Sequence, residues 1–176
     1  VNDAGTLCGS VKDLDHFIDF YGTNAPTNIA AIFENGKVVK LPYGDLDMQK
    51  IKQHEDGTFA AALSNDGKVV VGYCKCSNFA YSYPCKWTRG ANNEWKLEQL
   101  PLPDTYKYGL AINVSSDGRT IVGLAMEGGR AIACYWIDGK CYTVNCTNED
   151  AELAKMKQMR MIDMSPNGKY FIFSLS

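Results

Sequence analysis

The chain has 176 residues, of which 45% are hydrophobic and 22% charged, and its formal net charge at pH 7 is −2. Its 18 basic residues do not outnumber its 20 acidic ones, which excludes the positive surface expected of a protein that binds nucleic acid. The longest apolar runs, such as residues 170–173, are far too short for a membrane-spanning helix. The length suffices for one sizeable core or for several small units that share one.

A nine-residue motif recurs along the chain. Its copies are VNDAGTLCG at 1–9, SNDGKVVVG at 64–72, SSDGRTIVG at 115–123 and SPNGKYFIF at 165–173. The three later copies begin 51 and 50 residues apart, a period typical of propellers and related repeat arrays. We therefore predict a single repeat domain, 1–176, with units 1–63, 64–114, 115–164 and a partial unit 165–176.

The first unit opens with the turn Asp3–Gly5 and is longer than the others. The extra length is the segment Lys12–Phe20, which we place between the second and third strands of the unit. We predict the third strand at Ala31–Phe33 and the fourth at Lys37–Leu41, joined by a Gly-containing turn. Repeat arrays tolerate such insertions in loops, and these loops often carry binding.

The motif copies that open the second and third units each belong to a set of four short predicted strands, the first of which lies just before the motif. Alternating apolar residues form the first strand, in which Ala61 and Leu63, or Ile112 and Val114, share the buried face. A tight turn follows, because Gly and Asn tolerate the positive φ that two-residue hairpin turns require. The predicted strands of the first set are 59–63, just before the second unit, and then 69–71, 85–87 and 95–100 within it. Those of the second set are 110–114, just before the third unit, and then 120–122, 134–136 and 140–144 within it.

After the last predicted strand of the third unit, residues 147–156 combine an N-cap, an acidic first turn and good helix formers, which predicts a short helix. A first strand at Arg160–Met164 and a second at Tyr170–Ile172 follow. Four antiparallel strands in about 50 residues match one blade of a propeller. The predicted fold class is therefore all-β, with about three four-stranded blades of a partial β-propeller, in which the aromatic residue of the third strand fills the wedge between blades.

The seven cysteines do not form a disulfide framework or a zinc motif. Cys8, Cys85, Cys134 and Cys141 align with small or aliphatic residues of other units, so we interpret them as buried apolar side chains. The remaining three, Cys74, Cys76 and Cys146, have no such explanation. We predict that Cys74 and Cys76 form a thiol pair, or that one of them forms a disulfide with Cys146 or with Cys85. No metal site and no cofactor is predicted.

Aromatic residues gather near two loops and are the candidate ligand-binding residues, because rings on loops can stack on sugars or grip a peptide. They are Tyr73, Phe79, Tyr81, Tyr83, Tyr106 and Tyr108. The alternative is that these rings pack between blades.

No catalytic residue is predicted. The recurring Asp66, Asp117 and Asn167 belong to turns, where their side chains bond the backbone. The acidic Asp13, Asp15 and Asp19 are expected in a solvated loop, and the histidines, His16 and His54, form no triad by spacing. The alternative, a hydrolase, would draw its carboxylates from loops, at Asp45, Asp47 or Asp104.

The cadence A-[IL]-x-x-S-x-D-G-x-x-[IV]-V-G, followed by A-x-x-W and a Gly turn, resembles the repeat family named for a His-Ala-Phe motif. Residues 111–123 are the best copy, and the resemblance covers nearly the whole chain as about three units. The resemblance implies a β-propeller of the bacterial surface. Where that family has His-Ala-Phe, this chain has Ile29-Ala-Ala, Tyr83-Pro-Cys and Ile132-Ala-Cys.

From these features we expect a non-catalytic binding or scaffold module that is extracellular, at the cell surface or in the periplasm. Its ligand is expected to be a glycan or a protein. The alternative is a propeller-type hydrolase that acts on polysaccharide. Because three units and a fraction do not close a ring of four to eight blades, we expect either a homodimer or a piece of a longer chain.

Overall fold

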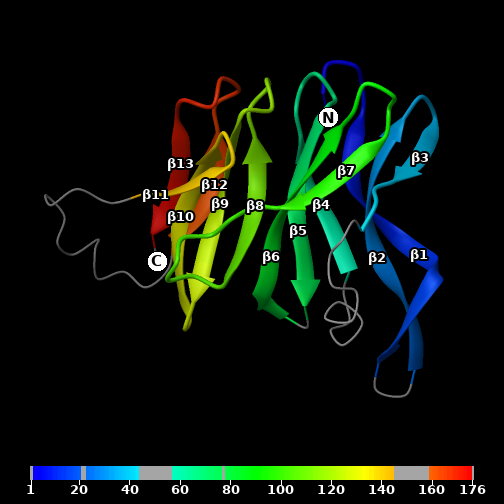
Figure 1. The fold of residues 1–176 in the computed structure, drawn as a ribbon, viewed down its shortest axis with the longest axis horizontal. Helices are drawn as coiled ribbons and strands as arrows, with labels where there is room; N and C mark the ends of the chain where they lie inside the picture. Colours follow the sequence, from blue (N-terminus) through cyan, green and yellow to red (C-terminus); the bar gives the residue numbers. More distant parts are fainter. Residues whose placement is uncertain (1, 21–22, 44–56, 77, 145–158, 176) are drawn as a thin grey trace, which may run out of the picture.

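The computed structural model describes residues 2–20, 23–43, 57–76, 78–144 and 159–175 (Figure 1). Every helix or strand in these ranges is a strand, so the predicted all-β class is confirmed for this part of the chain. The strands are β1 Leu7–Phe20, β2 Thr23–Glu34, β3 Lys37–Lys40, β4 Gly57–Leu63, β5 Val69–Cys76, β6 Asn78–Arg89, β7 Trp95–Gln99, β8 Tyr108–Val114, β9 Thr120–Glu127, β10 Arg130–Ile137, β11 Lys140–Thr143, β12 Met159–Met164 and β13 Phe171–Leu175. The predicted helix at 147–156 lies outside the described residues.

The strands form antiparallel meanders that stand side by side (Figure 1). Two are complete, with four strands each: β4-β5-β6-β7 and β8-β9-β10-β11. Before them comes the three-stranded β1-β2-β3, joined to β4 by a single parallel bridge between Asn28 and Gly57. After them comes the hairpin β12-β13. From here on, units 1 to 4 are these four meanders, whose bounds differ from the predicted units because a meander includes the strand before its motif. Within the described residues, none of the sheets closes on itself.

The insertion predicted at Lys12–Phe20 lengthens a hairpin instead of forming a loop. β1 and β2 continue their antiparallel pairing to Phe20 opposite Thr23, with an irregularity between Asp13 and Phe17. In Figure 1 this hairpin extends below the other strands. The sequence missed this because the segment is acidic, and its alternation is weak.

The first strands of units 2, 3 and 4, which are β4, β8 and β12, each carry a β-bulge or irregularity, and this corrects the predicted buried face. In β4 the pairing with β5 passes from Ala60 to Ala62, and in β8 the pairing with β9 passes from Ala111 to Asn113. The skipped residue does not follow the alternation of the strand. Ala61, which was predicted on the buried face, is consequently exposed. In β8 it is Ala111, outside the predicted buried face, that is fully buried.

The repeated motif forms a turn that is longer than the predicted two-residue hairpin. Only the glycine takes a positive φ, +70° at Gly67. The Ser64 hydroxyl donates to Asp66 Oδ1 (2.6 Å) and accepts the N–H of Val69 (3.0 Å), and Asp66 also accepts the N–H of Lys68 (3.0 Å). The turns of units 3 and 4 repeat these contacts at Ser115 with Asp117 and at Ser165 with Asn167. The predicted side-chain to backbone bonding is confirmed.

These turns also join one unit to the next, all at the same end of the molecule. The Asn65 N–H donates to the Ser116 carbonyl (3.0 Å), and the Ser116 N–H donates to the Pro166 carbonyl (2.7 Å). In the same direction, from unit 1 to unit 2, the Asp3 N–H donates to Asn65 Oδ1 (2.9 Å). The motif is therefore repeated because each copy is both a turn and a connection between units.

The core lies between the sheets. One cluster packs Ile32 and Leu41 of unit 1 against Val70, Cys85 and Trp87 of unit 2. A second cluster packs unit 2 against unit 3 in the same way and includes Val71, Leu100, Ile121, Cys134 and Trp136. The tryptophan of the third strand is thus fully buried between neighbouring units, as predicted.

Each buried tryptophan is also fixed by a hydrogen bond to the preceding unit. Trp87 Nε1 donates to the carbonyl of Pro42 (2.9 Å), and Trp136 Nε1 donates to the carbonyl of Pro101 (2.6 Å). Both prolines come directly after a buried leucine at the end of a fourth strand. The pairs Leu41-Pro42 and Leu100-Pro101 therefore position the next unit.

Candidate binding sites

The structure brings together two of the predicted aromatic residues at the boundary between units 2 and 3. The rings of Tyr83 on β6 and Tyr108 on β8 are 5.8 Å apart and tilted by 58°. Tyr83 also packs against the first core cluster. These two rings therefore stabilise the contact between units, as the alternative interpretation expected.

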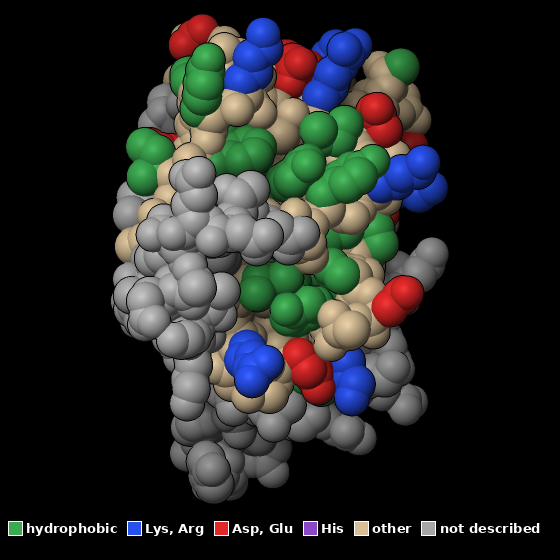
Figure 2. Space-filling view, turned by 90° about the vertical axis from the view of Figure 1, so that its left-hand side faces the viewer, with side chains coloured by type: hydrophobic (Ala, Val, Ile, Leu, Met, Phe, Trp, Pro, Cys, Tyr) green, Lys and Arg blue, Asp and Glu red, His purple; other side chains and the backbone are tan. Residues whose placement is uncertain are grey.

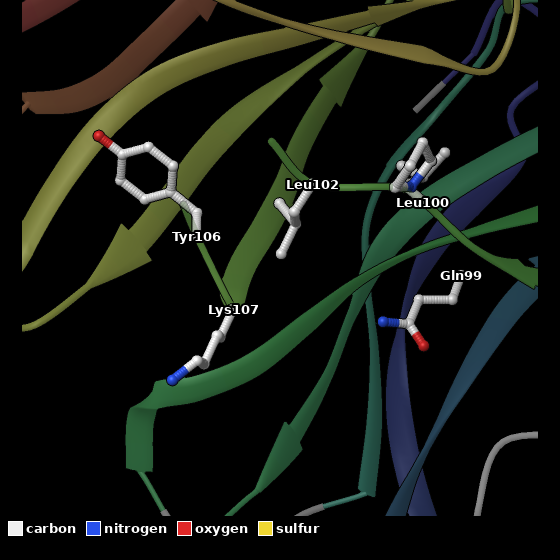
Figure 3. A pocket seen from close by; sticks show the side chains of 6 residues that line it. Gln99, Leu100, Leu102, Tyr106 and Lys107 are labelled. Atoms are coloured by element: carbon white, nitrogen blue, oxygen red, sulfur yellow. The ribbon is translucent and has the colours of Figure 1, made fainter. Parts of the chain in front are cut away.

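Tyr106 lies in the loop between β7 and β8 and lines an open groove (Figure 3). The groove has a volume of about 360 Å³ and is lined by Gln99, Leu100, Pro101, Leu102, Tyr106 and Lys107. A bond from the Tyr106 N–H to the Pro103 carbonyl (2.8 Å) holds the loop. Figure 3 shows Tyr106 and Lys107 on one side of Leu102 and Leu100 on the other.

The groove combines apolar, aromatic and cationic groups. Tyr106 is half-buried and packs against the second core cluster, so its position is set by the core. Lys107 is mostly exposed, and its Nζ lies 3.6 Å from a carboxylate oxygen of Glu127 on β9. Such a lining suits a sugar ring or a peptide side chain beside an acidic group.

The other predicted aromatic residues do not join this groove. The ring of Tyr73 stacks on Phe59 of the neighbouring strand at 5.4 Å. Phe79 and Tyr81 belong to β6, and only their backbone lies within the described part of the structure. Residues Gln99, Leu100, Leu102 and Lys107 were missed, because nothing in their spacing distinguishes a groove from an ordinary connection.

The cysteines with aliphatic counterparts occupy the positions expected of apolar side chains. Cys85 and Cys134 are buried at 0% and 1% exposure, while Cys8 and Cys141 are half-buried. Cys74 is also buried and packs in the first core cluster. A bond of Cys74 with Cys76 or Cys146 stays a prediction, since the side chain of Cys76 and the whole of Cys146 lie outside the described residues.

Cys134 and Cys141 interact across β10 and β11. The hydrogen bond with Cys141, together with burial, raises the pKa of the Cys134 thiol, and the same hydrogen bond lowers the pKa of Cys141. Both sulfurs lie against the second core cluster. The pair is consequently a packed pair of thiols between units 2 and 3.

The carboxylates considered for a hydrolase are only partly within the described residues. Asp104 is exposed in the β7–β8 loop, and Asp45, Asp47 and His54 lie outside the described residues. Within the described chain, no three His, Cys, Asp or Glu side chains gather as metal ligands.

Asp13 differs from the expectation of a solvated loop. It lies on β1 and is 2% exposed, and its carboxylate accepts a hydrogen bond from Lys40 Nζ (2.8 Å) and one from the Tyr43 hydroxyl (3.4 Å). The Tyr43 hydroxyl also lies 3.3 Å from Thr27 Oγ1, and burial is the main cause that raises the pKa of Tyr43. This network satisfies a buried charge and fastens β3 and the residues after it to the first hairpin.

Each end of the array presents an apolar face. At the unit 4 end, Figure 2 shows hydrophobic side chains gathered at the centre of the face with charged side chains around them. Exposed apolar residues are Ile137 on β10, Tyr142 on β11, Tyr170 just before β13 and Ile172 on β13. In unit 1, the exposed apolar residues include Leu7, Phe33 and Val38.

No family model and no curated protein matches the chain. Among solved structures, TolB from Acinetobacter baumannii has a similar fold, with a TM-score of 0.51 and 10% sequence identity. The match covers 83% of this chain and 31% of the TolB chain, so the chain spans about a third of the length of that relative. At this identity the likeness concerns the fold alone. In the described part of the chain, no helix is long and apolar enough to cross a membrane.

Proposed function

We propose that the chain forms part of a β-propeller and serves as a non-catalytic binding or scaffold module. Support comes from the stacked four-stranded units, which are the size of propeller blades, and from the fold likeness to TolB, a β-propeller protein. A place at the bacterial surface or in the periplasm follows the resemblance to the His-Ala-Phe repeat family. The proposed ligand is a glycan or a protein segment.

The groove at the β7–β8 loop is the observation that carries the binding role. It is an open concave site on a loop whose aromatic ring is positioned by the core, and it lies beside Lys107. Loops held by a rigid scaffold are the usual place of binding residues. An aromatic ring, leucine side chains and one cation favour a ligand with an apolar face and an acidic group.

The test is a screen of the chain against glycan and peptide arrays, followed by affinity measurements on the ligands found. Tyr106→Ala and Lys107→Ala should each weaken binding about tenfold or more, since central aromatic and charged contacts dominate small interfaces. Tyr170→Ala removes an exposed tyrosine at the far face and is the matched control. Unchanged binding by both groove variants would contradict the proposal.

The hydrolase alternative has its own test. A polysaccharide panel is incubated with the chain and with Asp104→Asn, and reducing ends are measured. Turnover that disappears in the variant would favour the enzyme and would contradict the non-catalytic role.

A further inference from the structure

We propose that the free edge of β1, at Leu7–Val11, is a docking site for one extended β-strand. The incoming strand would pair antiparallel with β1, as β4 pairs with β5 and β8 with β9. Its chemistry is that of these first strands: small and aliphatic residues, with a bulge two residues before the end. The argument rests on comparing unit 1 with units 2 and 3 and does not depend on the proposed function.

Within the described residues, β1 pairs only with β2, whereas β5 and β9 are each paired on both sides. An exposed strand edge presents unpaired N–H and C=O groups and is a template for strand addition. Native sheets usually protect such an edge with charges, prolines or a short strand. The segment Leu7–Val11 has none of these features.

Gly9 identifies what is missing at this edge. It takes the place of Gly72 in unit 2 and Gly123 in unit 3, since each is the ninth residue of its motif. A Cβ at Gly72 would lie 1.8 Å from the Phe59 carbonyl oxygen, and one at Gly123 would lie 1.9 Å from that of Leu110. At Gly9 no atom of the described chain lies within 4 Å. The glycine is thus fitted to the carbonyl of a strand that the described residues do not supply.

Cys8 gives a second, independent sign. Its counterparts Val71 and Val122 are buried at 0% and 1% exposure in the complete units. Cys8 remains half-buried, although it packs against the first core cluster, just as Val71 packs in the second. A first strand beside β1 would cover it.

The turn before β1 is already formed. The Asn2 N–H donates to the Thr6 carbonyl (3.1 Å), as the Ser64 N–H donates to the Val69 carbonyl (2.8 Å). The Asn2 side chain accepts the Thr6 N–H (2.8 Å) and replaces the serine of the other copies. Binding of a strand therefore requires no rearrangement of this turn, which favours addition to a preformed edge.

The experiment uses the 176-residue chain and a synthetic peptide with the sequence of Tyr108–Ser115, the first strand of unit 3. With the peptide in excess, amide hydrogen exchange in Leu7–Val11 should slow by about tenfold or more. Alkylation of Cys8, followed by mass spectrometry, should slow in parallel. The control peptide carries proline in place of Ala111 and should protect neither, because proline cannot donate to a ladder.

Two variants decide the outcome. Gly9→Val should abolish protection by the peptide and leave the Tm of the chain alone unchanged, because its side chain meets open space until the strand arrives. Ser10→Val, a matched change at the position of Tyr73, should keep the protection. The proposal is overturned if the peptide protects nothing, if Gly9→Val binds it as well as the parent chain, or if Gly9→Val lowers the Tm, which would mean that the chain itself covers this edge.

Discussion

Trp87 and Phe33 occupy the same position in units 2 and 1, opposite Leu97 and Val38 of the adjacent strand, yet their surroundings are opposite. Trp87 is fully buried and hydrogen-bonded to the preceding unit. Phe33 is 44% exposed, and it lies at the end of the array.

The difference shows that a unit does not bury its own third strand. Burial of that aromatic residue comes from the unit before it, because each sheet has one face that only a neighbour can cover. This is the nearest-neighbour dependence expected of repeat proteins. The stability of a residue in this chain therefore depends on its place in the array as much as on its identity.

The largest effect is expected for Trp87→Ala, which should lower the free energy of unfolding by about 3–5 kcal/mol. Phe33→Ala should cost less than about 1.5 kcal/mol, because nearly half of the ring is already in water. Urea unfolding of both variants measures the difference. Trp87→Phe, which gives unit 2 the residue of unit 1, should fall between them, since it loses the bond to Pro42. Equal losses for the two alanine variants would break the comparison.

Gly123→Ala and Gly9→Ala compare a strand that has a neighbour on both sides with the free edge of β1. The new Cβ would collide with the carbonyl of Leu110, so a loss of roughly 2–3 kcal/mol is expected. Gly9→Ala has open space and should change the unfolding midpoint little. Thermal unfolding followed by circular dichroism is sufficient. A glycine-to-alanine change that costs the same at both sites would contradict the assignment of Gly9 to an uncovered edge.

A smaller effect concerns charges between units and within one sheet. Arg89 makes two hydrogen bonds to Glu34 of the preceding unit, at 2.8 and 2.9 Å, in a partly buried place. Glu34→Gln should cost about 1 kcal/mol. Glu98→Gln breaks the more exposed bridge to Lys86 within unit 2 and should cost about 0.5 kcal/mol or less. Denaturant midpoints at low and high salt would order the two, and a reversed order would contradict this comparison.

The smallest expected effect is a pH-dependent contribution to stability that distinguishes the turn of unit 3 from that of unit 4. A hydrogen bond from the Ser115 hydroxyl, then one from the Arg119 N–H, lowers the pKa of Asp117. A carboxyl whose pKa is lower in the folded state stabilises the fold at pH values above its unfolded pKa of about 3.9. This stabilisation is lost as the pH falls through the pKa of the folded state. The Tm difference between the parent chain and Asp117→Asn should therefore shrink below about pH 4.

Unit 4 provides the reciprocal test, because Asn167 stands where unit 3 has Asp117. Asn167→Asp should add a pH-dependent contribution to stability of the same sign. The screening by water at this exposed turn keeps both effects small. A Tm difference that is constant from pH 6 to pH 2.5 would rule out a role for the carboxylate charge.

Much of the fold could be predicted from sequence, because turns and strands leave local signals. The positive φ values at Asn35 and Gly36, and the serine and aspartate of the repeated motif, follow directly from residue chemistry. The bulge at Ala61 and the buried carboxylate of Asp13 could not be predicted. Both depend on the strand or side chain that lies opposite, and that partner comes from elsewhere in the chain.

The candidate site was predicted only in part for the same reason. Tyr106 was identified as an aromatic residue near a loop, but Leu102 and Lys107 became visible only when the loop was folded onto unit 2. Tyr83 and Tyr108 looked like loop residues, and the structure shows them packed between units.

By itself, the sequence determined the period, the order of strands in each unit and the turn chemistry, because these depend on residues within about ten positions of one another. The tertiary structure alone decided which faces are covered. Val70 and Leu7, or Gly72 and Gly9, are equivalent in sequence, and only the presence or absence of a neighbouring strand or sheet separates a buried position from an open one. Burial is a property of two surfaces in contact, and one copy of a repeat encodes only one of them.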